Sequence, residues 1–373
     1  MELSGEDLSQ SSTIGGWLMF SYAFFQFLFA PLIGGLSDRY GRRPVLLLSL
    51  LGFGLDYILL ALAPTLAWLF IGRIISGIFG ASFTTGSAYI ADVSAPEKRA
   101  QNFGLIGAAF GLGFIIGPVI GGLLGSYGSR VPFYAAAILT LLNALYGFFI
   151  LPESLPKEKR RPFKFSRANP IGSIKVFKNR PMILGLLFGL SFIYIASHAV
   201  QSTWTFYTMY RFEWDEKMVG YSLGFVGILS ALVQGLLIRV LIPKLGQEKS
   251  VYIGMLFYTI GLVLFGFAFE GWQMYPYMII YCLGGIAGPA LQGIMSNYVA
   301  DDQQGELQGA NTSMMSLTSI IGPPMMTGIF AYYTSVDNPI QLPGAPMFLG
   351  AFLVIIGTYF SYRALRKVRV KKD

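Results

Sequence analysis

The chain has 373 residues, of which 54% are hydrophobic and only 12% are charged, about half the roughly 25% that is usual in soluble proteins. So few charged side chains cannot cover a soluble globular protein of this length, and so many apolar residues exclude a disordered chain. The net charge is +8, and the one cysteine, Cys282, excludes an intrachain disulfide and a cysteine-based metal cluster. The composition therefore predicts a membrane protein with several spans.

Runs of about 18 or more apolar residues predict transmembrane helices. Eleven such runs follow one another along the chain, at 14–36, 45–63, 66–88, 101–124, 131–151, 182–204, 219–241, 249–269, 274–299, 307–333 and 346–365. Residues 1–13 are polar and acidic and do not resemble a secretory signal. We therefore expect an all-α, multi-pass membrane protein.

The distribution of Lys and Arg predicts the orientation of these helices. Twenty-three of the 27 basic residues lie in loops that the eleven spans place on one side of the membrane, and only three lie on the other side. Because cytoplasmic loops are enriched in basic residues, we expect the C-terminus in the cytoplasm and the N-terminus outside. The positive charge is thus divided among loops, so no nucleic-acid partner is expected.

The chain also repeats itself. The segment that ends at Asp92, Tyr-Ile-Ala-Asp, recurs as Tyr-Val-Ala-Asp301, and Ile-Ile-Gly117-Pro recurs as Ile-Ile-Gly322-Pro. The offsets of 209 and 205 residues keep the copies collinear, and each pair lies on the same predicted side of the membrane. The sequence therefore predicts two parallel repeats rather than inverted ones.

The repeat divides the chain into two helical halves. We expect a first half of five spans at 1–151, a basic cytoplasmic linker at 152–181, and a second half of six spans at 182–373. In the second half, three spans precede the span that ends at the Tyr-Val-Ala-Asp copy, but in the first half only two spans precede the one that ends at Tyr-Ile-Ala-Asp. We therefore expect that the first helix of a twelve-helix protein is missing from this sequence, as a mis-assigned start codon would produce.

The loop after the first span carries a motif with fixed charges. It reads Gly35-Leu-Ser-Asp38-Arg39-Tyr-Gly41-Arg42-Arg43-Pro44. Glycine at its centre permits a tight turn, and the aspartate can cap a helix. Together with two parallel repeats of helices, this loop resembles the signature of the major facilitator superfamily. The resemblance implies a charge relay with Asp92 that holds the outward-open state. The alternative is a basic loop that only sets topology.

A glycine motif lies in the fourth span. It consists of Gly104, Gly113, Gly117, Pro118 and Gly121, with Gly125 four residues further on. This pattern resembles the motif of drug/proton antiporters in the superfamily, which implies a bendable helix that limits leak. The spacing of four predicts a smooth stripe that another helix can approach closely, and proline can kink the helix. Close helix packing alone is the alternative.

Nearly the whole chain resembles the tetracycline-resistance branch of these antiporters. Shared segments include Asp56-Tyr57, Leu151-Pro-Glu-Ser154 and Gln304-Gly-Glu-Leu-Gln-Gly309, with Gln234 as a further match. This chain differs where the branch has a histidine, replaced here by Ser230, and an acid, replaced here by Tyr258. The resemblance implies proton-coupled export, and the differences imply that coupling runs on fewer acids.

Ionisable residues inside spans are costly, so each is a functional candidate. Asp56 and Arg73 lie seven residues from the facing ends of adjacent spans, which predicts similar depth and a pair that takes part in proton coupling. The alternative is a static ion pair. His198, the single histidine, is a candidate for substrate contact or a hydrogen-bonded structural residue. Further polar candidates for a substrate cavity are Asn143, Gln201 and Gln292.

We therefore expect a monomeric secondary transporter in the cytoplasmic membrane that exports small organic molecules in exchange for protons by alternating access. The alternatives are an uptake symporter of the same fold and a truncated form without transport, such as a receptor. An enzyme is not expected, because the sequence shows no phosphate-binding glycine loop with lysine and no nucleophile with a base partner. No cofactor and no metal site are expected either.

Overall fold

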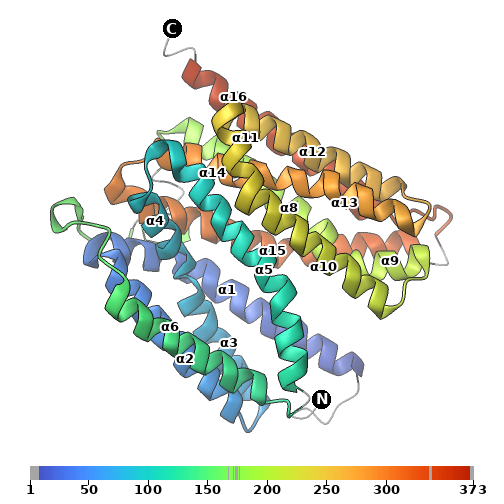
Figure 1. The fold of residues 1–373 in the computed structure, drawn as a ribbon, viewed down its shortest axis with the longest axis horizontal. Coiled ribbons are helices and arrows are strands. Elements are labelled where there is room, and N and C mark those ends of the chain that lie inside the picture. The colour runs from blue at the N-terminus through green and yellow to red at the C-terminus, as the bar shows by residue number, and fades with distance from the viewer. Residues whose placement is uncertain are drawn as a thin grey trace. The chain divides into compact units, whose positions relative to one another are not determined.

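The computed structural model describes residues 8–125, 127–166, 168–170, 172, 175, 177–335 and 338–369. These residues form helices joined by short loops, with no β-strand among them, which confirms the predicted all-α class (Figure 1). Ten helical stretches in the described chain are long and apolar enough to cross a membrane. The remaining predicted span, 101–124, coincides with helix α5, Arg99–Gly125.

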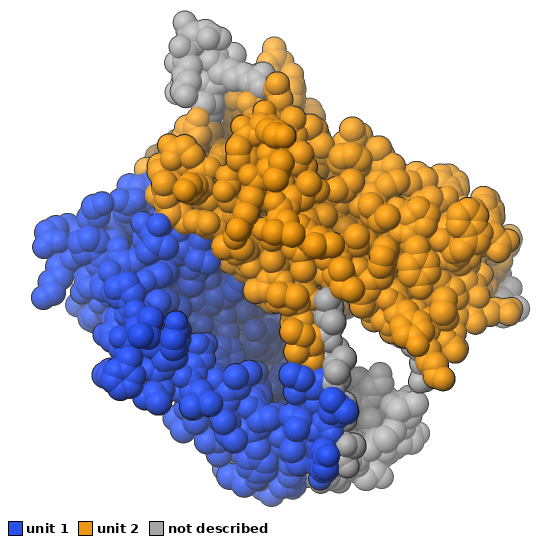
Figure 2. All heavy atoms as spheres, in the orientation of Figure 1, with its two compact units in different colours: residues 1–93, 118–176, 299–317 blue, residues 94–117, 177–298, 318–373 orange. Residues whose placement is uncertain are grey.

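The chain folds as two compact units, coloured separately in Figure 2. Unit 1 comprises residues 1–93, 118–176 and 299–317, and unit 2 comprises residues 94–117, 177–298 and 318–373. The units therefore do not follow the two sequence halves. The N-terminal part of α5 belongs to unit 2, and the N-terminal part of α15, Gln304–Thr334, belongs to unit 1.

Unit 1 is built mainly from the helices of the first half. They are α1 (Leu8–Tyr40), α2 (Arg42–Leu62), α3 (Leu66–Gly80), α4 (Phe83–Val93) and α6 (Val131–Ile150), with short η2 (Lys157–Lys159) and η6 (Asp301–Gln303). In this unit α2 packs against α6 and α3, and α1 packs against α3. The predicted span 66–88 is divided into α3 and α4 by a turn at residues 81–82.

Unit 2 contains the helices of the second half. They are α8 (Pro181–Gln201), α9 (Trp204–Phe212), α10 (Glu216–Leu232), η3 (Val233–Leu237), α11 (Ile238–Leu245), α12 (Gln247–Phe267), η4 (Gly271–Gln273), α13 (Met274–Leu283), η5 (Gly284–Ile286), α14 (Ala287–Asn297) and α16 (Ala345–Arg369), with η1 (Pro96–Lys98) before α5. Here α16 packs against α8 and α12, and α12 packs against α13 and α14.

Small residues allow the closest of these helix contacts. A Cβ atom added to Gly189 of α8 would lie 2.2 Å from Ser361 Oγ of α16, and one added to Gly254 of α12 would lie 2.7 Å from the Ala287 backbone nitrogen of α14. Such glycines bring helix backbones together where lipid supplies no hydrophobic driving force between helices.

Two features of unit 2 were not predicted. Helix α9 is too short to be detected as a span, and it is held by hydrogen bonds from Trp204 Nε1 to Ser222 Oγ (2.9 Å) and from the Tyr207 hydroxyl to the Phe265 carbonyl (2.5 Å). The predicted span 219–241 contains a π-helical turn, η3, which includes Gln234. A π-helical turn inserts one residue into the helix, and apolar periodicity does not reveal it.

Candidate functional site

A glycine turn between α1 and α2 brings the motif's charges together. Gly41 adopts φ 102°, a conformation that favours glycine, and a Cβ there would lie 2.2 Å from Glu153 Oε2. The turn places Asp38, in the last turn of α1, beside Arg42, the first residue of α2. Arg42 Nη1 donates to Asp38 Oδ1 at 2.5 Å, and both side chains are almost fully buried.

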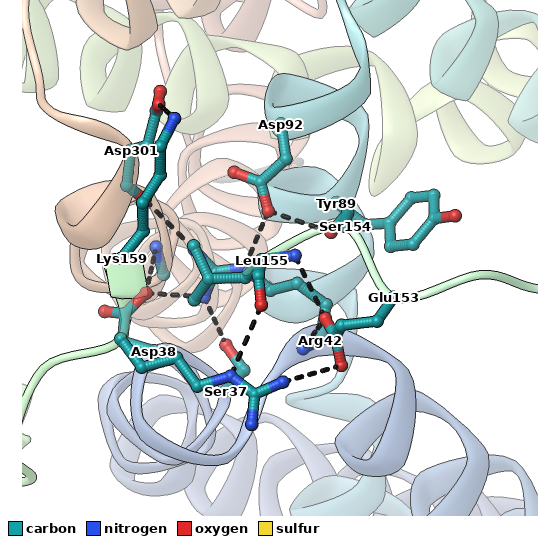
Figure 3. Close-up of polar contacts among 12 residues, drawn as sticks. Ser37, Asp38, Arg42, Tyr89, Asp92, Glu153, Ser154, Leu155, Lys159 and Asp301 are labelled. Carbon is teal, nitrogen blue, oxygen red and sulfur yellow. Dashed lines mark hydrogen bonds and ion pairs between the residues drawn. The ribbon is translucent and has the colours of Figure 1, made fainter. Parts of the chain in front are cut away.

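Arg42 joins both copies of the repeated segment (Figure 3). Its Nε donates to Asp92 Oδ2 at 3.0 Å, and its Nη2 donates to the backbone carbonyl of Asp301 at 3.3 Å. Nη1 also donates to Ser37 Oγ at 2.8 Å. Because Asp92 and Asp301 are equivalent positions of the internal repeat, one buried guanidinium contacts the same position of both sequence halves.

Asp38 lies at the N-terminus of α15. The backbone N–H of Gly305 donates to Asp38 Oδ1 at 3.0 Å, so the carboxylate interacts with the positive end of the helix dipole. The backbones of α1 and α15 approach closely here, since a Cβ added to Gly34 would lie 2.3 Å from the Gly305 carbonyl oxygen. A larger residue at either position would separate the carboxylate from the helix N-terminus.

Residues at the start of the linker form further hydrogen bonds with this group of charged residues. Glu153 Oε1 accepts a hydrogen bond from the backbone N–H of Arg42 at 2.8 Å, and Ser154 Oγ donates to Asp92 Oδ2 at 2.9 Å (Figure 3). Glu153 also pairs with Arg160 at 3.5 Å. We define the charged cluster as Ser37, Asp38, Arg42, Asp92, Glu153, Ser154 and Gly305.

The other residues of the motif lie outside this network. The Arg39 guanidinium stacks over the Tyr40 ring at 4.9 Å. Arg43 lies over the Phe148 ring at 5.5 Å and donates to the Phe148 carbonyl, which ties α2 to α6. Gly35 packs beside Ala168 of the linker. These residues contribute packing and positive charge rather than ion pairs with the acidic residues of the cluster.

Asp56 is buried between α2 and α3, and its partner differs from the predicted one. Ser76 Oγ donates to Asp56 Oδ2, and no ion pair with Arg73 occurs among the described side chains. A Cβ added to Gly72 would lie 3.2 Å from Asp56 Oδ1, so α3 presents Gly72 and Ser76 to α2. Arg73 is rotated by about 100° from Gly72 around the helix, which explains why equal depth did not produce a pair.

The cavity candidates in α8 have partners within unit 2. His198 is 9% exposed, and its ring packs against Gly322 of α15, where an added Cβ would lie 2.3 Å from His198 Cδ2. Gln201 is exposed, and its Nε2 donates to Ser197 Oγ at 3.2 Å. Helix packing therefore fixes the histidine ring more tightly than the glutamine.

Two cavity candidates lie on other helices. Gln292 Nε2 of α14 donates to the Tyr194 hydroxyl of α8 at 3.3 Å, which joins two helices of unit 2. Asn143 of α6 in unit 1 is exposed, beside exposed Leu139 and Tyr146. The four polar candidates are thus distributed between the two units.

Comparison with known proteins identifies the fold family. The profile of the Major Facilitator Superfamily matches residues 2–323. The chain belongs to the major facilitator superfamily. This transporter is 41% identical over 347 residues to the class C tetracycline resistance protein of Escherichia coli, covering 92% of this chain and 87% of that protein. The class B protein of Escherichia coli is 37% identical over 317 residues, covering 84% and 78% of the two chains.

Solved structures agree with this assignment. The human organic anion transporter MFSD10 superimposes with a TM-score of 0.81 at 26% identity, covering 93% of this chain and 83% of that chain. The proton:xylose symporter XylE superimposes with a TM-score of 0.75 at 16% identity, covering 96% and 87%, which supports the fold alone. The identity to the class C and class B tetracycline resistance proteins confirms the predicted resemblance to that branch. As a member of this family, the chain is a multi-pass membrane transporter of small molecules rather than an enzyme.

The glycine motif of the transporter packs differently from the prediction. A Cβ added to Gly113, Gly117, Gly121 or Gly125 meets no described atom within 4 Å. The close approach occurs nearer the N-terminus of α5, where a Cβ at Gly104 would lie 2.8 Å from the Gln234 carbonyl oxygen. The reason is that the glycines spaced by four lie on a different face of α5 from the one that contacts η3. The side chain of Pro118 lies outside the described residues.

Hydroxyl and thiol groups lie close together at two places in unit 2. The hydroxyls of Tyr258 and Tyr281 lie 3.0 Å apart and their rings stack at 4.8 Å. Ser230 Oγ lies 3.8 Å from Cys282 Sγ. Ser230 and Tyr258, where the sequence predicts differences from the tetracycline-resistance branch, thus take part in hydroxyl contacts, and coupling through fewer acids stays a prediction.

Sequence reasoning missed one polar centre in α1 of the transporter. Gln26 Nε2 donates to the Gly80 carbonyl and to the Tyr22 hydroxyl, both at 3.2 Å, and its Oε1 accepts from Ser316 Oγ of α15 at 3.0 Å. A glutamine inside an apolar run was the available signal, as it was for Gln201 and Gln292.

Proposed function

We propose that this transporter exports small, partly apolar organic molecules of the tetracycline type in exchange for protons. The observation that carries the proposal is the buried Arg42 side chain, which contacts equivalent positions of both repeat halves. The named activity of the tetracycline-resistance relatives supports export of drugs. We further propose a monomer in the cytoplasmic membrane, with its C-terminus in the cytoplasm and with halves at 1–151 and 182–373.

The charged cluster would serve as the gate on the cytoplasmic side. Asp38 binds the N-terminus of α15, and Arg42 binds Asp92 and the Asp301 carbonyl. Alternating access requires the two halves to separate at this end, so these contacts must break once per cycle. Buried charges that lose a partner are strongly unfavourable, so the closed gate is favoured until substrate or proton binding offsets this cost.

Asp56 is the proposed proton carrier. Its side chain is 1% exposed, it accepts from Ser76 through one oxygen, and its Oδ1 has no hydrogen-bond donor among the described groups. A protonated carboxyl can use this oxygen as a donor, and a charged one requires a counter-ion in an apolar setting. Arg73, one residue from the packed face of α3, is the proposed counter-ion when the carboxylate is charged.

The polar groups of unit 2 are proposed to contact the substrate. Tyr194, Gln292 and His198 present a phenol, an amide and an imidazole from α8 and α14. Such neutral hydrogen-bonding groups suit a polycyclic solute with hydroxyl and amide substituents. Asn143 and Gln201 are weaker contributors, because both side chains are exposed.

Inverted membrane vesicles provide the test of direction and coupling. We expect vesicles that carry the transporter to accumulate tetracycline, followed by its fluorescence, when their interior is made acidic, and to lose it when a protonophore removes the gradient. Accumulation driven by the opposite gradient would establish uptake instead. Vesicles without any gradient-dependent accumulation of tetracycline or related polycyclic drugs would contradict the proposal.

A further inference from the structure

The linker is anchored on unit 1 beyond its first residues. The backbone N–H of Arg161 donates to the Asp38 carbonyl at 3.2 Å, and Leu155 is 1% exposed. With the contacts of Glu153 and Ser154 described above, these interactions hold residues 153–161 against α1, α2 and α4. We call residues 153–161 the linker strap. It is a docked segment rather than a loose connection between the sequence halves.

Two basic residues of the linker strap bind the start of the second half's penultimate span. Lys159 Nζ pairs with Asp301 Oδ2 at 2.8 Å, and both side chains are about half exposed. This hydrogen bond and the negative charge of Asp301 raise the pKa of Lys159 above its usual value, so the lysine of this pair stays charged at physiological pH. Arg161 Nη2 pairs with Glu306 Oε2, and the Glu306 side chain is 4% exposed.

Arg161 also lies close to Asp38, a residue of the proposed gate. Its Nη2 lies 3.8 Å from Asp38 Oδ2, so one guanidinium lies between Asp38 of α1 and Glu306 of α15. Glu306 Oε1 has no hydrogen-bond donor within the described structure, so Arg161 is the group that compensates its buried charge. The pocket beside this pair is lined by Pro31 and Phe163 together with Lys164 and both members of the pair.

We propose that the linker strap is a second component of the cytoplasmic gate, with Arg161 and Glu306 as positioning residues that hold α15 against α1. The proposal rests on the alternating access proposed above. The Arg161–Glu306 pair carries most of the effect because it is buried, whereas the exposed Lys159–Asp301 pair contributes little. The linker thus has to release α15 in each cycle, in addition to connecting the halves.

The test measures how often α15 leaves α1. Ser313 of α15 is fully buried, and its Oγ donates to the Phe27 carbonyl of α1 at 3.0 Å. With Cys282→Ser removing the native thiol, Ser313→Cys reports opening through its reaction with a membrane-impermeant methanethiosulfonate on inverted vesicles. We expect Arg161→Gln and Glu306→Gln each to raise the reaction rate about tenfold. The double variant should react no faster than either single variant, because both remove one interaction.

Two further linker variants serve as controls. Lys159→Gln should raise the rate by no more than about threefold, as expected for an exposed pair. Lys157→Gln removes the same charge from an exposed linker residue and should leave the rate unchanged. Arg161→Lys keeps the charge and should restore most of the protection, which separates loss of the ion pair from misfolding.

Two results would overturn the linker proposal. One is a rate for Arg161→Gln or Glu306→Gln equal to that of Lys157→Gln, and the other is additive rates in the double variant. The assay uses neither substrate nor a pH gradient. Failure of drug transport, with the expected increase in the reaction rate of the introduced thiol still present, would therefore contradict the proposed function and leave the linker proposal supported.

Discussion

The turn between α1 and α2 and its counterpart in the second repeat, between α11 and α12, have similar backbone conformations but different surrounding side chains. Gly41 has φ 102° and Gly246 has φ 80°, and each separates two helices at the same register of the repeat. Asp38 precedes the first turn by three residues, where the second copy has exposed Pro243. A Cβ at Gly41 would lie 2.2 Å from Glu153 Oε2, whereas one at Gly246 would meet no described atom within 4 Å.

This difference separates what the fold requires from what transport requires. Both turns need a residue that tolerates positive φ, because each reverses the chain within one residue. Buried carboxylates, by contrast, are found in unit 1, where Asp38, Asp56 and Glu306 are almost fully buried. In unit 2 the described buried ionisable side chains include Arg99 and His198 but no carboxylate. This difference supports the proposal that gating and proton coupling reside in unit 1.

The largest expected effect comes from neutralising Asp56. Asp56→Asn keeps an oxygen that accepts from Ser76 but cannot exchange a proton, so gradient-driven accumulation of tetracycline in inverted vesicles should disappear while binding remains. Ser76→Ala, which removes only the hydrogen bond, should retain gradient dependence. Unchanged gradient-driven accumulation in Asp56→Asn would remove proton coupling from this residue.

Asp38→Asn should reduce export about 100-fold. It leaves Arg42 buried with one fewer counter-charge and weakens the contact with the N-terminus of α15, a loss of about 3–5 kcal/mol for the closed gate. Initial rates of efflux from loaded cells measure the effect. Pro243→Asn places the same asparagine side chain at the equivalent, exposed position of the second turn. It should leave efflux within about twofold of the parent protein. Similar losses in both variants would contradict the asymmetry.

Alanine at the two turn glycines should distinguish strain from crowding. Gly246→Ala should cost about 1–3 kcal/mol, since its backbone conformation is essentially restricted to glycine. Gly41→Ala has the same strain and also displaces the Glu153 carboxylate from the Arg42 backbone N–H. Thermal unfolding in detergent should therefore show a larger decrease in melting temperature for Gly41→Ala, and equal decreases would argue against the crowded first turn.

The smallest effect concerns the glycine motif of α5. Gly104→Ala should lower the melting temperature, since the added methyl group meets the Gln234 carbonyl oxygen at 2.8 Å. Gly117→Ala meets no described atom within 4 Å, and alanine favours a helix by about 0.5–1 kcal/mol over glycine, so stability should stay equal or rise. A larger decrease in melting temperature for Gly117→Ala than for Gly104→Ala would support the predicted packing stripe.

The sequence predicted the spans and the parallel repeat, because apolar runs and repeated motifs are local signals, and the family resemblance implied a charge relay between the loop motif and Asp92. It did not predict that Ser76 replaces Arg73 as the partner of Asp56, since a depth argument ignores which face of α3 meets α2. The pairing of Arg161 with Glu306 could not be predicted from the sequence either, because it joins segments 145 residues apart in the chain. The π-helical turn that includes Gln234 lies close to Gly104 of α5, and apolar periodicity does not reveal it.

The most direct test of the central claim is a distance measurement across the gate. Spin labels at the exposed positions Tyr40→Cys and Ala300→Cys, in the Cys282→Ser background, report by double electron–electron resonance whether the start of α15 stays beside the end of α1. We expect one short distance in the parent protein, a second, longer population in Asp38→Asn, and no change in Pro243→Asn. An unchanged distribution in Asp38→Asn would contradict the assignment of the gate to this cluster.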